Sequence, residues 1–328
     1  MRGSAGRACA FATLLVASVM AAGQVSAQSQ YPEKPIRLIV PQAPGSATDT
    51  LARLIIAELA PIIGQTIVIE NKPGAAFTIG LDLVAKSAPD GYTLGMAPVG
   101  AIAISPNMIA KVPYNVERDF QPVMLATRGH LLLAVSPKSP FHSVRDIIDA
   151  AKRNPGKLTN ASSASGSPGH VGAELFKVMT ETNIVHVPYR GGAAATSDLI
   201  AGHVDIMFES LNSIAPHAKS GEVRALAVSG ARRSPGFPEL PTVAEAGVPG
   251  YDAPTWSGVV GPAGMPREIV MKLNSALNRV VVTPAFVQRF GVIGDEPAGG
   301  TPEEFGATIS KELAKWADVI KRSGAKLE

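Results

Sequence analysis

The chain has 328 residues, of which 46% are hydrophobic and 17% are charged, a composition typical of a globular protein with room for two domains. Its formal net charge of +3 is too small to indicate a nucleic-acid or an anionic-membrane partner. The composition also excludes a collagen, a coiled coil, a multispan membrane protein and a disulfide scaffold.

The N-terminal segment has the layout of a secretory signal peptide. Two arginines form a basic start, an apolar run covers residues 8–22, and small residues precede the expected cut. The run is shorter than the roughly 20 residues that a membrane span needs. We therefore expect a signal peptide over residues 1–27, cleaved after Ala27. Because Cys9 is the one cysteine of the sequence, the mature chain is expected to lack disulfides and thiolate metal sites.

Strand and helix patterns then alternate along the chain. The first strand is expected at residues 36–40, and the helix that follows covers 51–63, begins near Thr48 and Asp49 and ends at Gly64. Further strands are expected at residues 66–70, 92–96, 131–135, 184–187, 205–208 and 224–228. Further helices are expected at residues 144–153, 170–180, 193–201, 211–219, 266–281 and 302–321. This rhythm predicts an α/β fold with parallel sheets and helices on both faces, in which ligands bind beyond the carboxyl ends of the strands.

The sequence lacks the polar motifs of common enzymes and cofactor sites. It contains no G-x-S-x-G elbow, no G-x-x-x-x-G-K-[ST] loop, no G-x-G-x-x-G and no H-E-x-x-H. His186 lies inside a predicted strand and is interpreted as structural. We therefore predict no catalytic residue, no metal and no cofactor.

Two loops rich in Gly and Ser precede predicted helices, PGSATDT at residues 44–50 and SSASGSPGH at residues 162–170. Such loops direct backbone N–H groups and a helix N-terminus toward one point, which makes an anion site without a fixed charge. An N-capped turn is the ordinary explanation of one such loop. Two of them, in different halves of the chain, favour a binding site.

Several longer strings follow in order along the chain, among them ENKPGAAFTIG, APDGYTL, HVPYRGG and LPTVAEAG. On these strings the sequence, from about Tyr31 to its end, resembles the periplasmic solute receptors of the tripartite tricarboxylate transporter system, also called the Bug family. The resemblance implies a type II periplasmic binding protein whose two lobes, with parallel-sheet cores, close over a carboxylated solute. It also implies a periplasmic location, delivery of the solute to membrane permease subunits, and no catalysis. We expect a monomer.

The order of elements suggests where the lobes begin and end. The first lobe is expected to comprise residues 28–127 and 251–328, and the second lobe residues 128–250. Two crossing segments near Ala126 and Ala253 would form the hinge, a common device for closure around a ligand.

The resemblance implies a pocket built from loops of both lobes. On the first lobe it includes Gln42, Gly45, Ser46, Ala47, Thr48, Asp49, Ala75, Ala76, Phe77, Val99, Gly100 and Ala101. On the second lobe it includes Ser162, Ser163, Ser165, Gly166, Ser167, His170, Tyr189, Arg190, Gly191, Glu209 and Ser210. The first loop would supply backbone N–H groups to one carboxylate, and the loop at residues 162–170 would hold the far end of the ligand.

The chain departs from the family pattern on the first-lobe side. Gln42 stands where the family usually has Phe, Gly45-Ser46-Ala47 where it has three glycines, and Ala76-Phe77-Thr78 where it has Gly-Gly-Asn. Pro98, Val99 and Ala101 replace residues that commonly carry a hydroxyl group. On the second lobe, Glu209 replaces an Asp. The wall thus loses hydroxyls and gains apolar surface, which predicts a dicarboxylate with an apolar middle, aliphatic or aromatic, in place of citrate. Pocket drift in a paralogue explains the same changes and stays open.

Three other functions were weighed against a transport receptor. A receptor that feeds a membrane signalling protein stays open. A secreted hydrolase would use Ser167 and His170, but no orienting acid is evident near them. The effector domain of a transcription regulator would need a helix-turn-helix before Ile36, where only the export signal stands.

Overall fold

The computed structural model describes residues 31–293 and 295–326, so the predicted signal peptide and Cys9 lie outside the described residues. Contacts divide the chain into units of residues 1–33 and 34–328. Every element described below belongs to the second unit. Within the described residues, no helix is long and apolar enough to cross a membrane.

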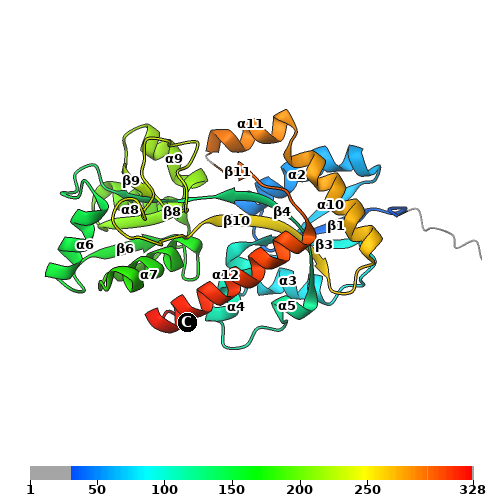
Figure 1. Cartoon of the computed structure of the whole chain (residues 1–328), viewed down its shortest axis with the longest axis horizontal. Coiled ribbons are helices and arrows are strands. Elements are labelled where there is room, and N and C mark those ends of the chain that lie inside the picture. Colours follow the sequence, from blue (N-terminus) through cyan, green and yellow to red (C-terminus); the bar gives the residue numbers. More distant parts are fainter. Residues whose placement is uncertain (1–30, 294, 327–328) are drawn as a thin grey trace, which may run out of the picture. The chain divides into compact units, whose positions relative to one another are not determined.

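The first sheet has the strand order β11-β4-β10-β3-β1-β2 (Figure 1). Its parallel part consists of β1 (Ile36–Val40), β2 (Ile67–Asn71) and β3 (Thr93–Pro98). Next to β3 lies β10 (Thr255–Pro262), which is antiparallel both to β3 and to β4 (Phe120–Gly129). The short β11 (Glu296–Pro297) is antiparallel to β4 and ends the sheet.

The second sheet has the order β7-β6-β8-β5-β9. Strand β6 (Thr159–Ser162) is parallel to β7 (Val185–Pro188) and to β8 (Ile206–Ser210). Strand β5 (Leu131–Val135) is antiparallel to β8 and to β9 (Arg224–Val228).

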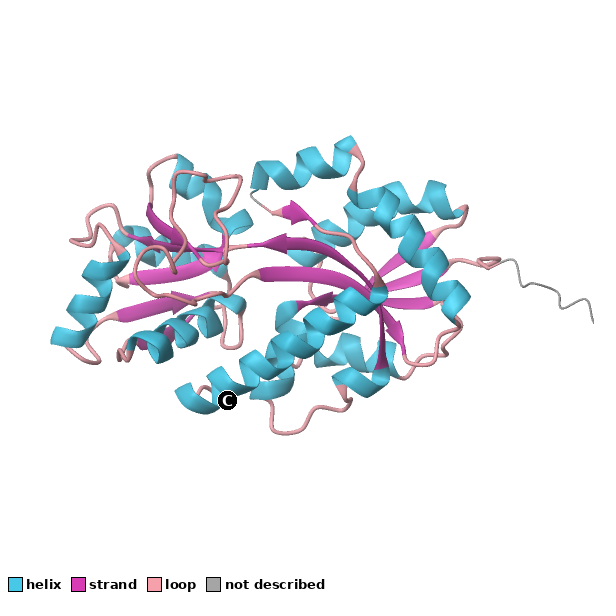
Figure 2. Cartoon of the chain, in the orientation of Figure 1, coloured by secondary structure: helices cyan, strands magenta, loops and turns pink. Residues whose placement is uncertain are grey.

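The predicted parallel cores are present as β2-β1-β3 and β7-β6-β8, and antiparallel strands are added on one side of each sheet. The chain leaves the first sheet along β4, continues almost directly into β5, and returns along β10. A returning strand must run opposite to the strand that left, so the pair β4–β10 is antiparallel. Figure 2 shows these two strands leading from the first sheet toward the second.

Helices cover the two sheets, as the alternating pattern predicts. They are α2 (Ala47–Ile63), α3 (Thr78–Ala85), the π-helix η1 (Gly100–Ile104), α4 (Ser105–Met108), α5 (Val116–Asp119), α6 (Val144–Arg153), α7 (Pro168–Thr180), α8 (Gly192–Ala201), α9 (Leu211–Lys219), α10 (Arg267–Val281), α11 (Pro284–Ile293) and α12 (Pro302–Ser323). Helix α12 follows β11 of the first sheet but packs against α7 of the second. One buried cluster accordingly includes Ile39 of the first sheet, Phe208 of the second and Trp316 of α12.

Candidate ligand-binding site

The loop between β1 and α2 is held together by the carboxylate of Asp49. Oδ2 of this buried side chain accepts the Gly45 N–H and the Arg53 Nε–H, each at 2.9 Å. Oδ1 accepts Asn71 Nδ2 at 2.9 Å. Ser46 caps α2, because its Oγ accepts the Asp49 N–H at 3.2 Å. The Arg53 hydrogen bond is the main reason why the pKa of Asp49 falls to about 2.

Because of these internal hydrogen bonds, the first loop has fewer free donors for a ligand than the sequence predicts. The N–H of Gly45 already has an acceptor within the loop, and the charge of Arg53 is neutralised by Asp49. Ala47, at the first position of α2, is exposed. Gln42 is half-buried, and its Oε1 is a buried atom without a hydrogen-bond partner among residues 31–293 and 295–326.

The loop between β2 and α3 has an unusual backbone. Ala75, Ala76 and Phe77 have φ values of 44°, 48° and 77°, in the left-handed region that favours glycine. Thr78 donates its Oγ1–H and its N–H to the Ala75 carbonyl oxygen, at 2.8 and 3.1 Å. The turn places the Phe77 ring against Gly100, where an added Cβ would lie 3.4 Å from Phe77 Cε2.

Gly100 marks the place where the two halves of the predicted site meet. The same added Cβ would lie 3.9 Å from Cδ of Pro168, the first residue of α7. Val99 and Ala101 on either side of it are buried. The structure thus brings the predicted loops at residues 75–77 and 99–101 to the N-terminus of α7.

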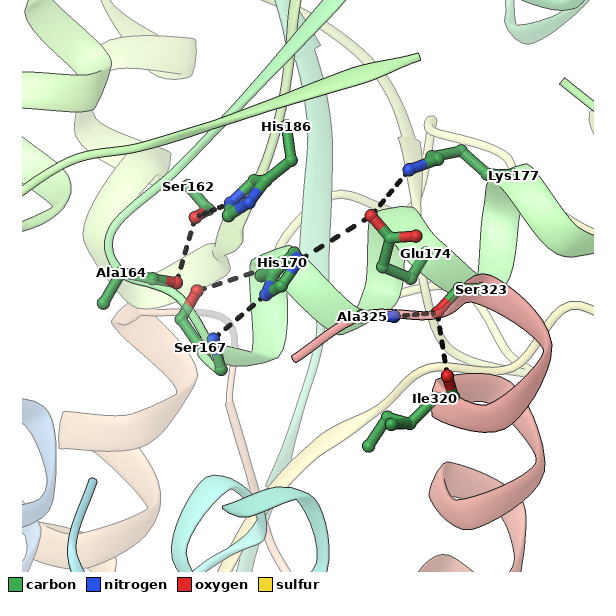
Figure 3. Close-up of polar contacts among 11 residues, drawn as sticks. Ser162, Ala164, Ser167, His170, Glu174, Lys177, His186, Ile320, Ser323 and Ala325 are labelled. Atoms are coloured by element: carbon green, nitrogen blue, oxygen red, sulfur yellow. Dashed lines mark hydrogen bonds and ion pairs between the residues drawn. The ribbon is translucent and has the colours of Figure 1, made fainter. Parts of the chain in front are cut away.

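The loop between β6 and α7 is tied to a stacked pair of histidines, of which His170 is buried and His186 half-buried (Figure 3). Ser167 caps α7 by accepting the His170 N–H at 3.3 Å, and Gly166 N–H donates to His170 Nδ1 at 3.0 Å. The rings of His170 and His186 stack with centroids 3.7 Å apart. Ser162 Oγ donates to the Ala164 carbonyl oxygen at 3.0 Å and lies 2.6 Å from His186 Nε2.

Both histidines are neutral at neutral pH. Burial, with the Lys177 charge as a lesser cause, lowers the pKa of His170 to about 3 and that of His186 to about 4. Because Nδ1 of His170 accepts from Gly166, the ring proton is on Nε2, which lies 3.7 Å from the buried Glu174. Neither nitrogen of His170 faces Ser167 as a base, so the geometry argues against the hydrolase alternative.

The loops after β7 and β8 complete the second half. Tyr189 N–H donates to the Ser162 carbonyl and Gly191 N–H to that of Ser163, both at 2.9 Å. Glu209 at the end of β8 is 6% exposed, and its Oε1 accepts the Ser210 N–H at 2.8 Å. Its other oxygen, Oε2, has no hydrogen-bond partner within the described chain.

Three other predicted residues of the second half are not buried at these loops. Ser165 and Arg190 are exposed, and Tyr189 turns its hydroxyl to Asp198 Oδ2 at 2.6 Å. Among the residues that the structure describes, no three His, Cys, Asp or Glu side chains gather as a metal site requires.

Sequence reasoning did not single out Ser257, whose backbone pairs with Pro98 in the first sheet. Its buried Oγ and the neighbouring Trp256 Nε1 lack hydrogen-bond partners in the described part of the chain. No sequence motif marks Ser257, because only the pairing of β10 with β3 brings it to the end of β3, next to the loop that begins at Val99.

Comparison with known proteins gives a consistent result. A family model described as the tripartite tricarboxylate transporter family receptor matches residues 51–325. Protein BugT of Bordetella pertussis is 36% identical over 96% of this chain and 97% of its own length. The structure of R. palustris Rpa4515 with adipate is 39% identical, with a TM-score of 0.81, and covers 90% of this chain and 100% of that chain. MatC from Rhodopseudomonas palustris with bound malate is 31% identical, with a TM-score of 0.78, and covers 88% of this chain and 100% of that chain.

Proposed function

Because the chain belongs to the tripartite tricarboxylate transporter receptor family of periplasmic solute-binding proteins, we propose that it captures a small dicarboxylate and delivers it to the membrane subunits of such a transporter. It is a solute receptor and not an enzyme. The observation that carries the proposal is the meeting of the Phe77 and Val99–Ala101 loops with the α7 N-terminus at Gly100. The N-terminus of α7, which suits an anionic group, lies there beside the apolar ring of Phe77.

We place the lobe boundaries where the sheets divide the chain. The first lobe would comprise residues 28–127 and 251–328, and the second residues 128–250. This division follows the sheet to which each strand belongs, except that the last two residues of β4 extend past it. Strands β4 and β10 would carry the hinge. Residues 1–27 would be removed during export, and an intact-mass measurement that finds them on the exported protein would contradict this.

The ligand that fits best has a carboxylate at each end and an apolar middle. The proposed wall beside Gly100 would be formed by Phe77, Val99 and Ala101, which offer no hydroxyl donor. Adipate, the ligand in the Rpa4515 structure, has this form, whereas the malate bound to MatC carries a hydroxyl group. The first-lobe wall supports an unsubstituted spacer, aliphatic or aromatic.

A matched series of ligands tests this proposal. The mature protein would be titrated by calorimetry with adipate, benzene-1,4-dicarboxylate, benzoate and citrate. We expect a dicarboxylate with an apolar middle to bind tightest. Benzoate has a single carboxylate and would engage one lobe only, and citrate would place a hydroxyl group and a third carboxylate against the apolar wall. A ligand at 100 times its Kd should also stabilise the fold by about 2.7 kcal/mol. Tighter binding of citrate or benzoate than of both apolar dicarboxylates would contradict the ligand assignment.

A further inference from the structure

The carboxyl group of Glu209 lies where three structural elements of the second half meet. Glu209 lies near the end of β8, and its Cα lies 3.9 Å from the position that a Cβ on Gly169 of α7 would take. A Cβ on Gly192, the first residue of α8, would lie 3.2 Å from Glu209 Oε2. Ser163, in the loop after β6, lies close enough to Glu209 to have a lowering effect on the pKa of its carboxyl group. The N-terminus of α8 therefore lies beside the Glu209 carboxyl group, and the N-terminus of α7 lies beside the backbone of the same residue.

Helix N-termini favour a negative charge, so the two together form an anion site. The group that stands in this site is itself an acid. If Glu209 is ionised, it occupies the anion site with its own charge and repels a ligand carboxylate. If it carries a proton, it leaves the site free for an anion and can donate one hydrogen bond to it. The unpartnered, buried Oε2 is the atom that can do so.

The surroundings of Glu209 favour the neutral form. Burial raises its pKa to about 7, against the lowering effects of the Ser210 N–H and of the Ser163 side chain. His170 on α7 and His186 on β7 are neutral, and Arg190 is exposed.

The other titratable groups on neighbouring elements are engaged elsewhere. Asp198 on α8 accepts the Tyr189 hydroxyl at 2.6 Å. His130, which precedes β5, lies 3.8 Å from Glu296, and burial lowers its pKa. Asp295, whose pKa burial also raises to about 7, accepts a hydrogen bond from Asn212 on α9 at 3.4 Å. Among residues 31–293 and 295–326, no charged side chain therefore forms an ion pair with Glu209 that would hold it in its ionised form.

We propose that Glu209 binds the ligand in its protonated state, with Oε2–H donating a hydrogen bond to the ligand carboxylate held by the N-termini of α7 and α8. Each ligand is then bound together with one proton whenever Glu209 of the free protein is ionised. The inference rests on the proposed function, since it needs a carboxylate in this site. A buried carboxylic acid that is kept neutral in order to donate a hydrogen bond is a known device in other proteins.

The direction of the pH dependence follows from the proton count. Below about pH 7 Glu209 of the free protein is protonated and affinity is at its full value. Above that pH the proton must be taken up on binding, and affinity falls by up to tenfold per pH unit. If an ionised Glu209 held a cationic group instead, affinity would not fall with rising pH.

Calorimetry with adipate as the probe tests the proposal. Wild-type protein would be titrated near pH 6 and near pH 8.5, in buffers of different ionisation enthalpy. We expect roughly 10- to 30-fold weaker binding at the higher pH and uptake of about one proton there. Glu209→Gln, which keeps a neutral donor, should bind with no proton uptake and little change between the two pH values. Asp295→Asn removes the other acid with a pKa of about 7 and should keep the wild-type pH dependence.

The possible results separate this inference from the proposed function. Adipate binding that does not change with pH, or a pH dependence that survives in Glu209→Gln, overturns the role of Glu209 and leaves the receptor function standing. If the wild-type protein binds neither adipate nor benzene-1,4-dicarboxylate near pH 6, the proposed function is contradicted. The proposed role of Glu209 is then contradicted as well, since it requires a bound carboxylate.

Discussion

At the scale of single residues, Asp49 fixes the shape of the first ligand loop. Its carboxylate accepts hydrogen bonds from Gly45, Arg53 and Asn71, which lie before it, after it and on β2. The pKa of Asp49 lies at about 2, below its ordinary value of 3.8. The stabilisation is therefore fully present above about pH 4 and is lost as the pH falls from 3.8 toward 2.

Asp49→Asn should lower the free energy of unfolding by about 1–3 kcal/mol at neutral pH, because hydrogen bonds to a charged acceptor are lost. Urea unfolding between pH 2 and 7 measures this loss, which should shrink at the acid end. Asp149→Asn is the matched control, since Arg145 and Asp149 form an exposed pair at 3.0 Å, and it should cost less than about 0.5 kcal/mol. An equal effect of the two variants would contradict the role assigned to Asp49.

At the scale of elements, the close contact between α7 and β8 sets the position of the second half of the site. A Cβ on Gly169 would lie 2.1 Å from the Phe208 carbonyl oxygen. Because this neighbour is backbone, the contact cannot be relieved by a side-chain rotation. The spacing between the α7 N-terminus and Glu209 thus depends on a glycine at this position.

Gly169→Ala should destabilise the protein by about 1–3 kcal/mol, the usual cost of overpacking, and should weaken dicarboxylate binding. Thermal unfolding and calorimetry with adipate measure the two effects. Gly291→Ala in α11 is the control, because an added Cβ there meets nothing within 4 Å. The control should leave stability unchanged or raise it slightly, since alanine favours a helix. Unchanged stability and binding in Gly169→Ala would show that α7 can shift freely.

The strong helix and strand patterns were predictable, whereas the crossing strands were not. Helices α2 and α7 begin at the two predicted loops, where Ser46 and Ser167 act as caps. Strand β4 contains Pro122 and β10 contains two glycines, residues that are uncommon in strands, so their patterns were weak. The candidate loops were found through a family resemblance. The hydrogen bond from Asn71 to Asp49 and the stacking of His170 on His186 are tertiary contacts, which cannot be predicted from the spacing of residues in the sequence.

At the scale of the whole molecule, the two sheets share more than the two crossing strands. Helix α12 packs against α7 as well as against β4, and the Tyr251 hydroxyl donates to the Gly172 carbonyl of α7 at 3.0 Å. Any opening of the proposed lobes must therefore displace the contact between α12 and α7. The arrangement described here is one in which loops of both halves already meet at Gly100.

A crystal structure of the mature protein grown with adipate tests the central claim most directly. We expect one carboxylate at the loop of residues 42–49, the other beside Glu209 and the N-termini of α7 and α8, and the methylene chain against Phe77. A dicarboxylate bound elsewhere, such as the cleft of about 370 Å³ lined by Lys177 and Arg322, with these loops unoccupied, would contradict it.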